Sequence, residues 1–251
     1  WVDSVMKTLT PEERIAQLIS IPVYSNKNQA HIDSISNIVK TYKVGGMIFF
    51  QGGPVRQAKM TNRYQQESKV PLMISIDGEW GLAMRLDSTI RFPYQMALGG
   101  IDNERLIYEM GAEIARQCQR LGVHVNFAPT VDINNNANNP VIGFRSFGED
   151  KYNVASKSMA YMKGMQDNRV LASAKHFPGH GDTNVDSHYG LPLINFSRIR
   201  LDSTELHPFR ALMDKGLGSV MVAHMNIPEL DNTPNLGTTL SKHIVTDVLK
   251  N

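Results

Sequence analysis

The chain has 251 residues, of which 41% are hydrophobic, so it is long enough and apolar enough to build one large domain with a sizeable core. A formal net charge of +2, without a run of lysine or arginine, argues against a nucleic-acid partner. A single cysteine, Cys118, excludes an internal disulfide and thiolate metal sites. No apolar run reaches the length of a membrane span.

The order of elements alternates between strands and helices. Thr10-Pro11-Glu12-Glu13 predicts a helix start, with Thr10 as the cap and Glu13 closing a capping box. Continuous apolar runs then predict six strands: Leu18–Val23, Val44–Phe50, Leu72–Asp77, Val123–Ala128, Val170–His176 and Ser219–Met225. Amphipathic patterns predict helices near Ile32–Tyr42, Val55–Gln66, Glu104–Arg120, Tyr152–Gln166 and Thr204–Lys215, and Ser241 caps a last helix to Lys250.

Strict alternation of this kind predicts an α/β fold with a parallel sheet covered by helices. Polar residues follow several successive strands, at Asp77, Asp132, Lys175-His176 and His224. An open doubly wound sheet collects its chemistry mainly at one switch point, whereas a (β/α)8 barrel of the TIM type uses the ends of many strands. We therefore expect such a barrel, truncated after about six βα units, with its last two strands outside this chain.

The densest group of reactive side chains lies in residues 175–188, Lys-His-Phe-Pro-Gly-His-Gly-Asp-Thr-Asn-Val-Asp-Ser-His. In the Asp186-Ser187-His188 part, the carboxylate can orient the imidazole, which can then give and take a proton near neutral pH. The alternative interpretation of such a pair is a hydrogen bond that only stabilises the loop. A metal site built from His176, His180, Asp182, His188 and His224 matches no known ligand spacing, and a phosphate cradle lacks the Gly-Lys-Ser/Thr signature.

This segment resembles the Lys-His-Phe-Pro-Gly-His-Gly…Asp-Ser-His signature of bacterial β-N-acetylglucosaminidases in glycoside hydrolase family 3. The resemblance covers nearly the whole chain. Asp77-Gly78-Glu79-Trp80-Gly81 with Arg85 is similar to the family's Asp-x-Glu-Gly-Gly…Arg, and Phe127–Asp132 is similar to its Phe-Ala-Pro-Val-x-Asp. Gly143–Gly148 matches Gly-x-Arg-Ser-Phe-Gly.

The resemblance implies a role for each matching residue. His188 would be the general acid/base and Asp186 would hold it. The terminal sugar would be bound through its hydroxyl and acetamido groups by Asp77, Arg85, Arg145, Lys175 and His176. The residue types suit these roles, because a carboxylate accepts hydrogen bonds from hydroxyls while arginine and lysine donate to oxygens. The resemblance implies no metal and no organic cofactor. His31, His207 and His243 are interpreted as surface histidines on helices.

Two features depart from the family pattern. Trp80 stands where the family has its first glycine after the glutamate. A retaining glycosidase also needs a carboxylate nucleophile, which in this family follows the seventh strand in a Gly-x-x-x-Thr-Asp stretch. No such stretch occurs before Asn251, and Thr246-Asp247 falls inside the last predicted helix. We therefore expect residues 1–251 to be the N-terminal and central part of a single family 3 catalytic barrel, with the nucleophile beyond residue 251.

The function implied is removal of terminal β-linked N-acetylglucosamine from peptidoglycan-derived muropeptides or related oligosaccharides, by a retaining mechanism. Phosphorolysis is a variant of it, because a neutral histidine does not repel phosphate as a carboxylate would. The alternatives are a β-glucosidase of the same family, a metal-dependent barrel hydrolase, and an inactive sugar-binding fragment without the nucleophile. A small carbohydrate is the expected partner, and a further C-terminal domain is compatible with the resemblance. The chain begins at Trp1 rather than Met, so the compartment, cytoplasmic or exported, stays open.

Overall fold

The structure is a computed structural model that describes residues 1–186 and 189–250. These residues form two compact units. One unit consists of Trp1–Phe92 and Ile114–Asn126, and the other consists of Pro93–Glu113 and Phe127–Asn251. The long helix α6 (Glu104–Arg120) begins in the second unit and ends in the first.

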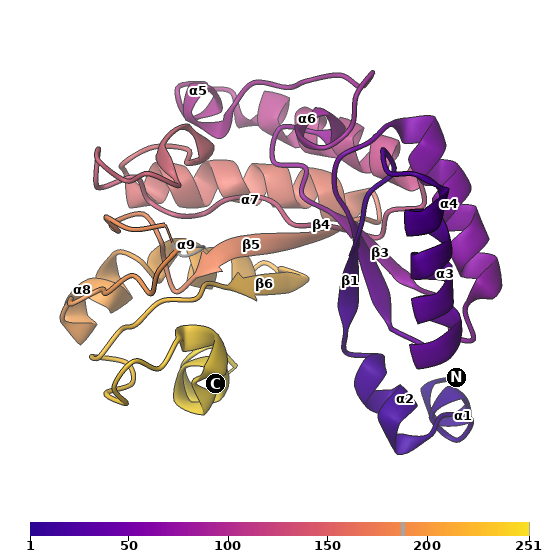
Figure 1. The fold of residues 1–251 in the computed structure, drawn as a ribbon. Helices are drawn as coiled ribbons and strands as arrows, with labels where there is room; N and C mark the ends of the chain where they lie inside the picture. The colour runs from indigo at the N-terminus through magenta and orange to yellow at the C-terminus, as the bar shows by residue number, and fades with distance from the viewer. Residues whose placement is uncertain (187–188, 251) are drawn as a thin grey trace. The chain divides into compact units, whose positions relative to one another are not determined.

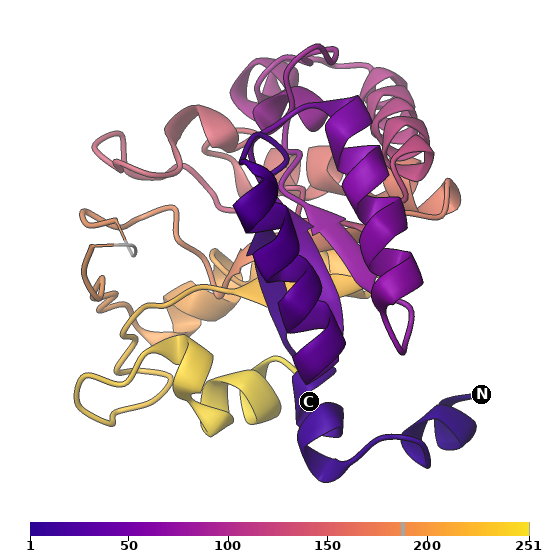
Figure 2. The ribbon, with the colours of Figure 1, turned by 45° about the vertical axis from the view of Figure 1, so that its right-hand side comes forward.

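The first unit is built on four parallel strands in chain order: β1 (Ser20–Val23), β2 (Gly46–Phe49), β3 (Met73–Ile76) and β4 (Val125–Asn126). Ser20 is in register with Gly46, Gly46 with Met73, and Ser75 with Val125. Helices α3 (Gln29–Tyr42) and α4 (Pro54–Glu67) contact each other and lie side by side along these strands (Figures 1 and 2). The parallel order places the carboxyl ends of all four strands at one edge, which is where Asp77 lies.

Three short helices complete the first unit: α1 (Val2–Met6), α2 (Pro11–Ala16) and the 3-10 helix η1 (Leu82–Met84). The expected capping box of α2 is confirmed, because Thr10 Oγ1 accepts from the backbone N–H of Glu13 and Glu13 Oε2 accepts from that of Thr10. Cys118 is buried in α6, and burial raises the pKa of its thiol to about 12, so the thiol is protonated near neutral pH.

The second unit is built around β5 (Leu171–Phe177), which pairs in parallel with β6 (Ser219–Val222). On its other edge β5 bonds to residues 128–131, where Ser173 N–H donates to Ala128 O at 2.9 Å and Val131 N–H donates to Lys175 O at 2.8 Å. Helix α7 (Lys151–Asp167) packs on β5 and on α9 (His207–Met213). The remaining elements are α5 (Gln95–Gly99), η2 (Gly143–Arg145), α8 (Arg198–Ser203), η3 (Thr238–Leu240) and the π-helix η4 (His243–Val248).

All six predicted strands are confirmed, with shorter bounds at most ends. The helix predicted near Thr204–Lys215 is confirmed as α9 with shorter bounds, and α8, which ends at Ser203, was not predicted. Between α8 and α9, the buried side chain of Glu205 accepts from Arg200, and Pro208 lies in the first turn of α9. The last helix is observed as the short π-helix η4, which ends at Val248; its N-cap is Lys242, and the predicted cap Ser241 precedes it and accepts through Oγ from the N–H of Ile244.

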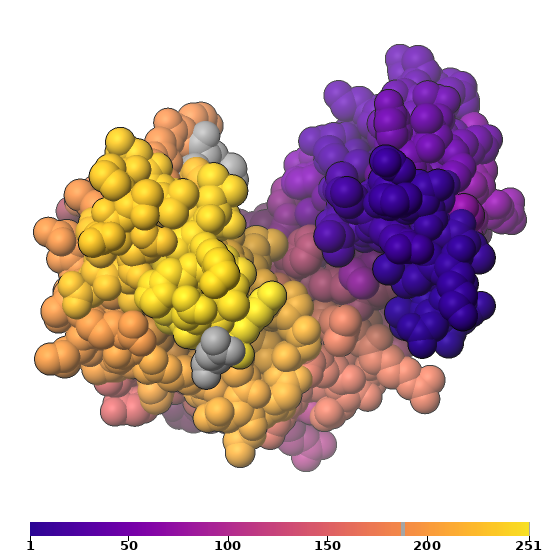
Figure 3. Space-filling model, turned by 90° about the horizontal axis from the view of Figure 1, so that it is seen from below, coloured from indigo at the N-terminus to yellow at the C-terminus, as the bar shows by residue number. Residues whose placement is uncertain are grey.

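The residues after β6 return to the body of the second unit. Thr238 N–H donates to Met225 O at 2.7 Å, and η3 contacts η4. Figure 3 shows this C-terminal segment in yellow, lying against the orange residues that precede it in the same unit. Among the described residues, no helix is long and apolar enough to cross a membrane.

Candidate active site

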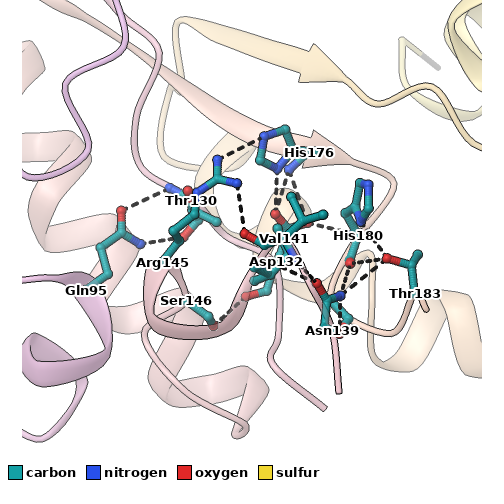
Figure 4. Close-up of polar contacts among 12 residues, drawn as sticks. Gln95, Thr130, Asp132, Asn139, Val141, Arg145, Ser146, His176, His180 and Thr183 are labelled. Carbon is teal, nitrogen blue, oxygen red and sulfur yellow. Dashed lines mark hydrogen bonds and ion pairs between the residues drawn. The ribbon is translucent and has the colours of Figure 1, made fainter. Parts of the chain in front are cut away.

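Asp132 is the centre of the polar network at the carboxyl end of β5 (Figure 4). Its carboxylate is fully buried and accepts from the backbone N–H of His176 at 3.1 Å, from the backbone N–H of His180 at 2.7 Å and from Nδ1 of His176 at 2.7 Å. A buried charge is tolerated when hydrogen bonds replace the water it has lost. Asp132 therefore fixes both histidines at the start of the loop that carries the signature.

Burial opposes the charge on Asp132, but the neighbouring His176 and the N–H groups of His176 and His180 overcome it. The net effect holds the pKa of Asp132 below its ordinary value. Burial lowers the pKa of His176, although the charge of Asp132 acts in the opposite direction, and Lys175 and Arg145 lower it further. Near neutral pH the pair is therefore a carboxylate beside a neutral imidazole.

This pairing assigns the two ring nitrogens of His176. Nδ1 carries the proton, because it faces a carboxylate that can only accept. Nε2 is then the acceptor, and Nη2 of Arg145 lies 3.4 Å from it. Nε2 of His176 can consequently accept a hydrogen bond from a hydroxyl or from a guanidinium, while Arg145 supplies a permanent positive charge beside it.

Arg145 is held by the asparagine-rich loop that precedes it. Its Nη1 donates to Val141 O at 3.1 Å. The side-chain oxygen of Asn139 accepts from the N–H groups of Val141 and Ile142, both at 2.8 Å, while its amide nitrogen donates to His180 O at 2.8 Å. Asn139 thus connects the loop bearing Arg145 to the loop that follows β5. The structure brings Arg145 and His176 together.

Lys175 is placed at the carboxyl end of β5 and is 2% exposed. Its backbone forms a parallel bridge with Thr130, whose own position is fixed by Gln95 of α5 through bonds of 2.7 and 3.1 Å. The Lys175–His176 peptide bond is cis. The Lys175 side chain extends from a strand end that is held by Thr130 on one side and by β6 on the other.

The loop after β5 carries the predicted proton-transfer pair. Asp186 is half-buried, and its carbonyl oxygen accepts from the N–H groups of Tyr189 at 3.0 Å and Gly190 at 3.2 Å. His188, the predicted general acid/base, lies outside the described residues. The interaction between Asp186 and His188 consequently stays a prediction.

In the first unit, the structure brings Asp77 and Arg85 together. Nη2 of Arg85 donates to Oδ2 of Asp77 at 2.8 Å, and the two side chains are only 18% and 13% exposed. Such a pair is screened much less by water than a surface salt bridge. Asp77 is the residue directly after β3, and Arg85 follows η1.

Trp80, the departure from the family pattern, lies half-buried in the loop after β3. The guanidinium carbon of Arg91 lies 5.9 Å from the centre of its ring. The next residue, Gly81, has φ of +84°, and a Cβ there would lie 2.7 Å from the ring of Phe92. The tryptophan therefore occupies the position before the glycine that the tight turn requires.

Two residues of the network were not assigned a role from the sequence. Asp132 belongs to the Phe127–Asp132 match, so the motif was a signal for it, but its three N–H partners are visible only in the structure. Asn139 lies in an asparagine-rich loop where one asparagine cannot be told from another by pattern. Among the described residues, no group of three or more His, Cys, Asp or Glu side chains is spaced to hold a metal ion.

Comparison with known proteins places the chain in a family. Residues 10–251 match the model described as glycosyl hydrolase family 3 N terminal domain, and the chain belongs to this family. It is 35% identical over 239 residues to beta-hexosaminidase A of Pseudoalteromonas piscicida, covering 86% of this chain and 40% of that protein.

Two solved structures are also similar. A glycoside hydrolase family 3 beta-N-acetylglucosaminidase from Paenibacillus sp. str. FPU-7 is 37% identical with a TM-score of 0.89, over 96% of this chain and 47% of that one. The beta-glucoside phosphorylase BglX bound to 2FGlc is 25% identical with a TM-score of 0.93, over 100% of this chain and 46% of that one. These likenesses confirm the α/β fold class of the TIM-barrel type. The chain spans less than half the length of these three relatives.

Proposed function

We propose that the protein containing this chain is a retaining β-N-acetylglucosaminidase that removes terminal β-linked N-acetylglucosamine. The observation that carries the proposal is the Lys175–His188 signature in a chain that is 37% identical to a family 3 beta-N-acetylglucosaminidase. The network at the end of β5 supports it, because a neutral His176 beside Arg145 presents an acceptor and a cation to one polar ligand.

In this proposal Asp77, Arg85, Arg145, Lys175 and His176 bind the hydroxyl and acetamido groups of the terminal sugar. His188 protonates the glycosidic oxygen while a carboxylate nucleophile attacks the anomeric carbon, and it then removes a proton from the water that releases the sugar. Asp186 orients the ring of His188. The nucleophile is expected outside this chain, since Asp247 lies within η4 and pairs with His243 at 2.9 Å.

The substrate class proposed is a muropeptide or a related oligosaccharide that ends in β-linked N-acetylglucosamine. Several relatives bear the name beta-hexosaminidase, which supports the sugar but not the rest of the substrate. A β-glucosidase of this family is the competing assignment. The Asp186-Ser187-His188 sequence argues against it, because those enzymes typically take a carboxylate acid/base from another domain.

Replacement of His188 by alanine in the full-length protein tests the mechanism. We expect kcat for 4-nitrophenyl N-acetyl-β-D-glucosaminide to fall by about 100-fold or more and KM to fall with it, because water attack without the base becomes the slow step and the glycosyl intermediate accumulates. His243→Ala is the matched control, since His243 lies on the exposed side of η4. An equal loss in kcat and in binding of N-acetylglucosamine would contradict the proton-transfer role.

Phosphorolysis is the second candidate, favoured by the similarity to a beta-glucoside phosphorylase. A neutral histidine acid/base does not repel an anionic acceptor such as phosphate, whereas a carboxylate would. Incubation of the full-length protein with substrate and inorganic phosphate distinguishes the two reactions. Formation of N-acetylglucosamine 1-phosphate supports phosphorolysis, whereas free N-acetylglucosamine as the sole product supports hydrolysis.

A further inference from the structure

The first unit carries a stack of side chains that ends on Asp77. Tyr24 and Phe50 directly follow β1 and β2, and their rings are stacked with centroids 5.5 Å apart and an interplanar angle of 21°. The guanidinium carbon of Arg85 lies 4.7 Å from the centre of the Phe50 ring, and Nη2 of Arg85 donates to Asp77 at 2.8 Å. We refer to Tyr24, Phe50, Arg85 and Asp77 as the strand-end column.

Hydrogen bonds of the Tyr24 N–H and of the Arg85 carbonyl hold the backbone from which these side chains extend. The N–H of Tyr24 donates to Nε2 of His31 at 3.3 Å, which requires a neutral ring. Burial lowers the pKa of His31, and Lys27 lowers it further, so the ring is neutral near pH 7. The carbonyl of Arg85 accepts from the N–H of Gly52, two residues after Phe50. His31, interpreted from the sequence as a surface histidine, is therefore half-buried and structural.

The aromatic ring of Phe50 matters because the guanidinium beside it is poorly hydrated. The Arg85 side chain is 18% exposed, and its Nε is buried without a hydrogen-bond partner among the described residues. An aromatic face attracts such a cation through its quadrupole, and it also restricts the guanidinium plane. A leucine would keep the position apolar but would offer no such face.

We infer that Tyr24 and Phe50 are positioning residues that act through Arg85 to hold the Asp77 carboxylate in place. The inference rests on the proposed function, in which Asp77 accepts hydrogen bonds from hydroxyls of the terminal sugar. A carboxylate that is already oriented loses less freedom when the sugar binds, so the column contributes mainly to affinity. The affinity for the terminal sugar would then depend in part on Tyr24 and Phe50, through the Asp77 carboxylate.

The test replaces Phe50 by leucine in the full-length protein and measures hydrolysis of 4-nitrophenyl N-acetyl-β-D-glucosaminide. We expect KM to rise by about fivefold, the value of one partly desolvated cation–π contact, with a smaller change in kcat. Phe50→Tyr keeps the aromatic face and should restore KM. Tyr42→Leu, which removes an exposed aromatic ring at the end of α3, is the matched control and should leave both constants unchanged.

A double-mutant cycle shows whether Phe50 acts through Arg85. In an Arg85→Met background, Phe50→Leu should cause little further change in KM, because the cation that the ring holds is gone. Additive effects, an unchanged KM in Phe50→Leu, or no rescue by Phe50→Tyr would overturn the inference. If Phe50→Leu does not fold, Tyr24→Leu replaces it in the test, and an unchanged KM in Tyr24→Leu would overturn the inference. An unmodified protein that does not hydrolyse the substrate would instead refute the proposed function.

Discussion

Asp132 accepts hydrogen bonds from two backbone N–H groups and one imidazole N–H, and an amide in its place could not. In Asp132→Asn one side-chain atom becomes a donor that faces other donors in a fully buried site. We expect a loss of about 1–3 kcal/mol in the free energy of unfolding, the cost of an unsatisfied buried group. Urea unfolding measures it, with the exposed Asp214→Asn as control. Equal stability of the two variants would show that the network contributes nothing.

The residues of the site differ in how far the sequence predicts them. Lys175 and His176 are predicted because they end an apolar run and match a signature, and both lie at the carboxyl end of β5. The role of Asp132 could not be predicted, because its partners are mostly backbone N–H groups whose direction depends on the folded loop. The same holds for Phe50, since the stacking of its ring on Tyr24 and Arg85 is a consequence of strand register.

The structural role of His31, in the first turn of α3, makes the stability of the first unit depend on pH. Its pKa is lowered in the folded chain, so an unfolded chain binds the proton more readily. The stabilisation is complete above about pH 6.5, the unfolded pKa, and is lost as the pH falls below it towards the folded pKa.

We expect the free energy of unfolding of His31→Gln to depend less on pH, because an amide oxygen can accept from the N–H of Tyr24 without titrating. The change in slope should stay below about 1.4 kcal/mol per pH unit, the limit for one group. Urea unfolding at pH 7, 6 and 5 gives both slopes. Identical slopes for the variant and the original chain would rule out a neutral His31 as the cause.

Helix α8 anchors the loop that carries the predicted proton-transfer pair. Nη2 of Arg200 donates to Asp182 at 2.8 Å and to Glu205 at 3.2 Å, and Glu205 is 4% exposed. Arg200→Gln should therefore speed amide hydrogen exchange in residues 179–186 and lower kcat, because a carboxylate is left buried and the loop loses an anchor. The control, Arg198→Gln, breaks only the more exposed pair with Asp202, worth at most about 1 kcal/mol. Equal exchange rates in the two variants would argue against the anchor.

The break before α9 shows why element boundaries were harder to predict than element types. Thr204–Lys215 has helical spacing throughout, but the observed helix α9 begins only at His207. Before it, Glu205 turns inward and accepts a hydrogen bond from Arg200 of α8. The strands were predicted well because parallel strands buried on both faces are continuous apolar runs. The pairing of α8 with the β5 loop depends on tertiary contacts and has no local signature.

For the whole molecule, the fold class and the family could be predicted, because ordered motifs at successive strand ends are specific to one architecture. The family match over residues 10–251 confirms that part of the prediction. The activity of the full-length protein is a proposal, since the chain spans 40% of beta-hexosaminidase A of Pseudoalteromonas piscicida.

We propose that the full-length protein recognises the acetamido group of a terminal N-acetylglucosamine. The most direct test compares kcat/KM of the full-length protein for 4-nitrophenyl N-acetyl-β-D-glucosaminide and for 4-nitrophenyl β-D-glucoside. We expect the first to exceed the second by about 100-fold or more, because sites that hydrogen-bond a polar group reject substrates that lack it. A higher kcat/KM for the glucoside would contradict the account.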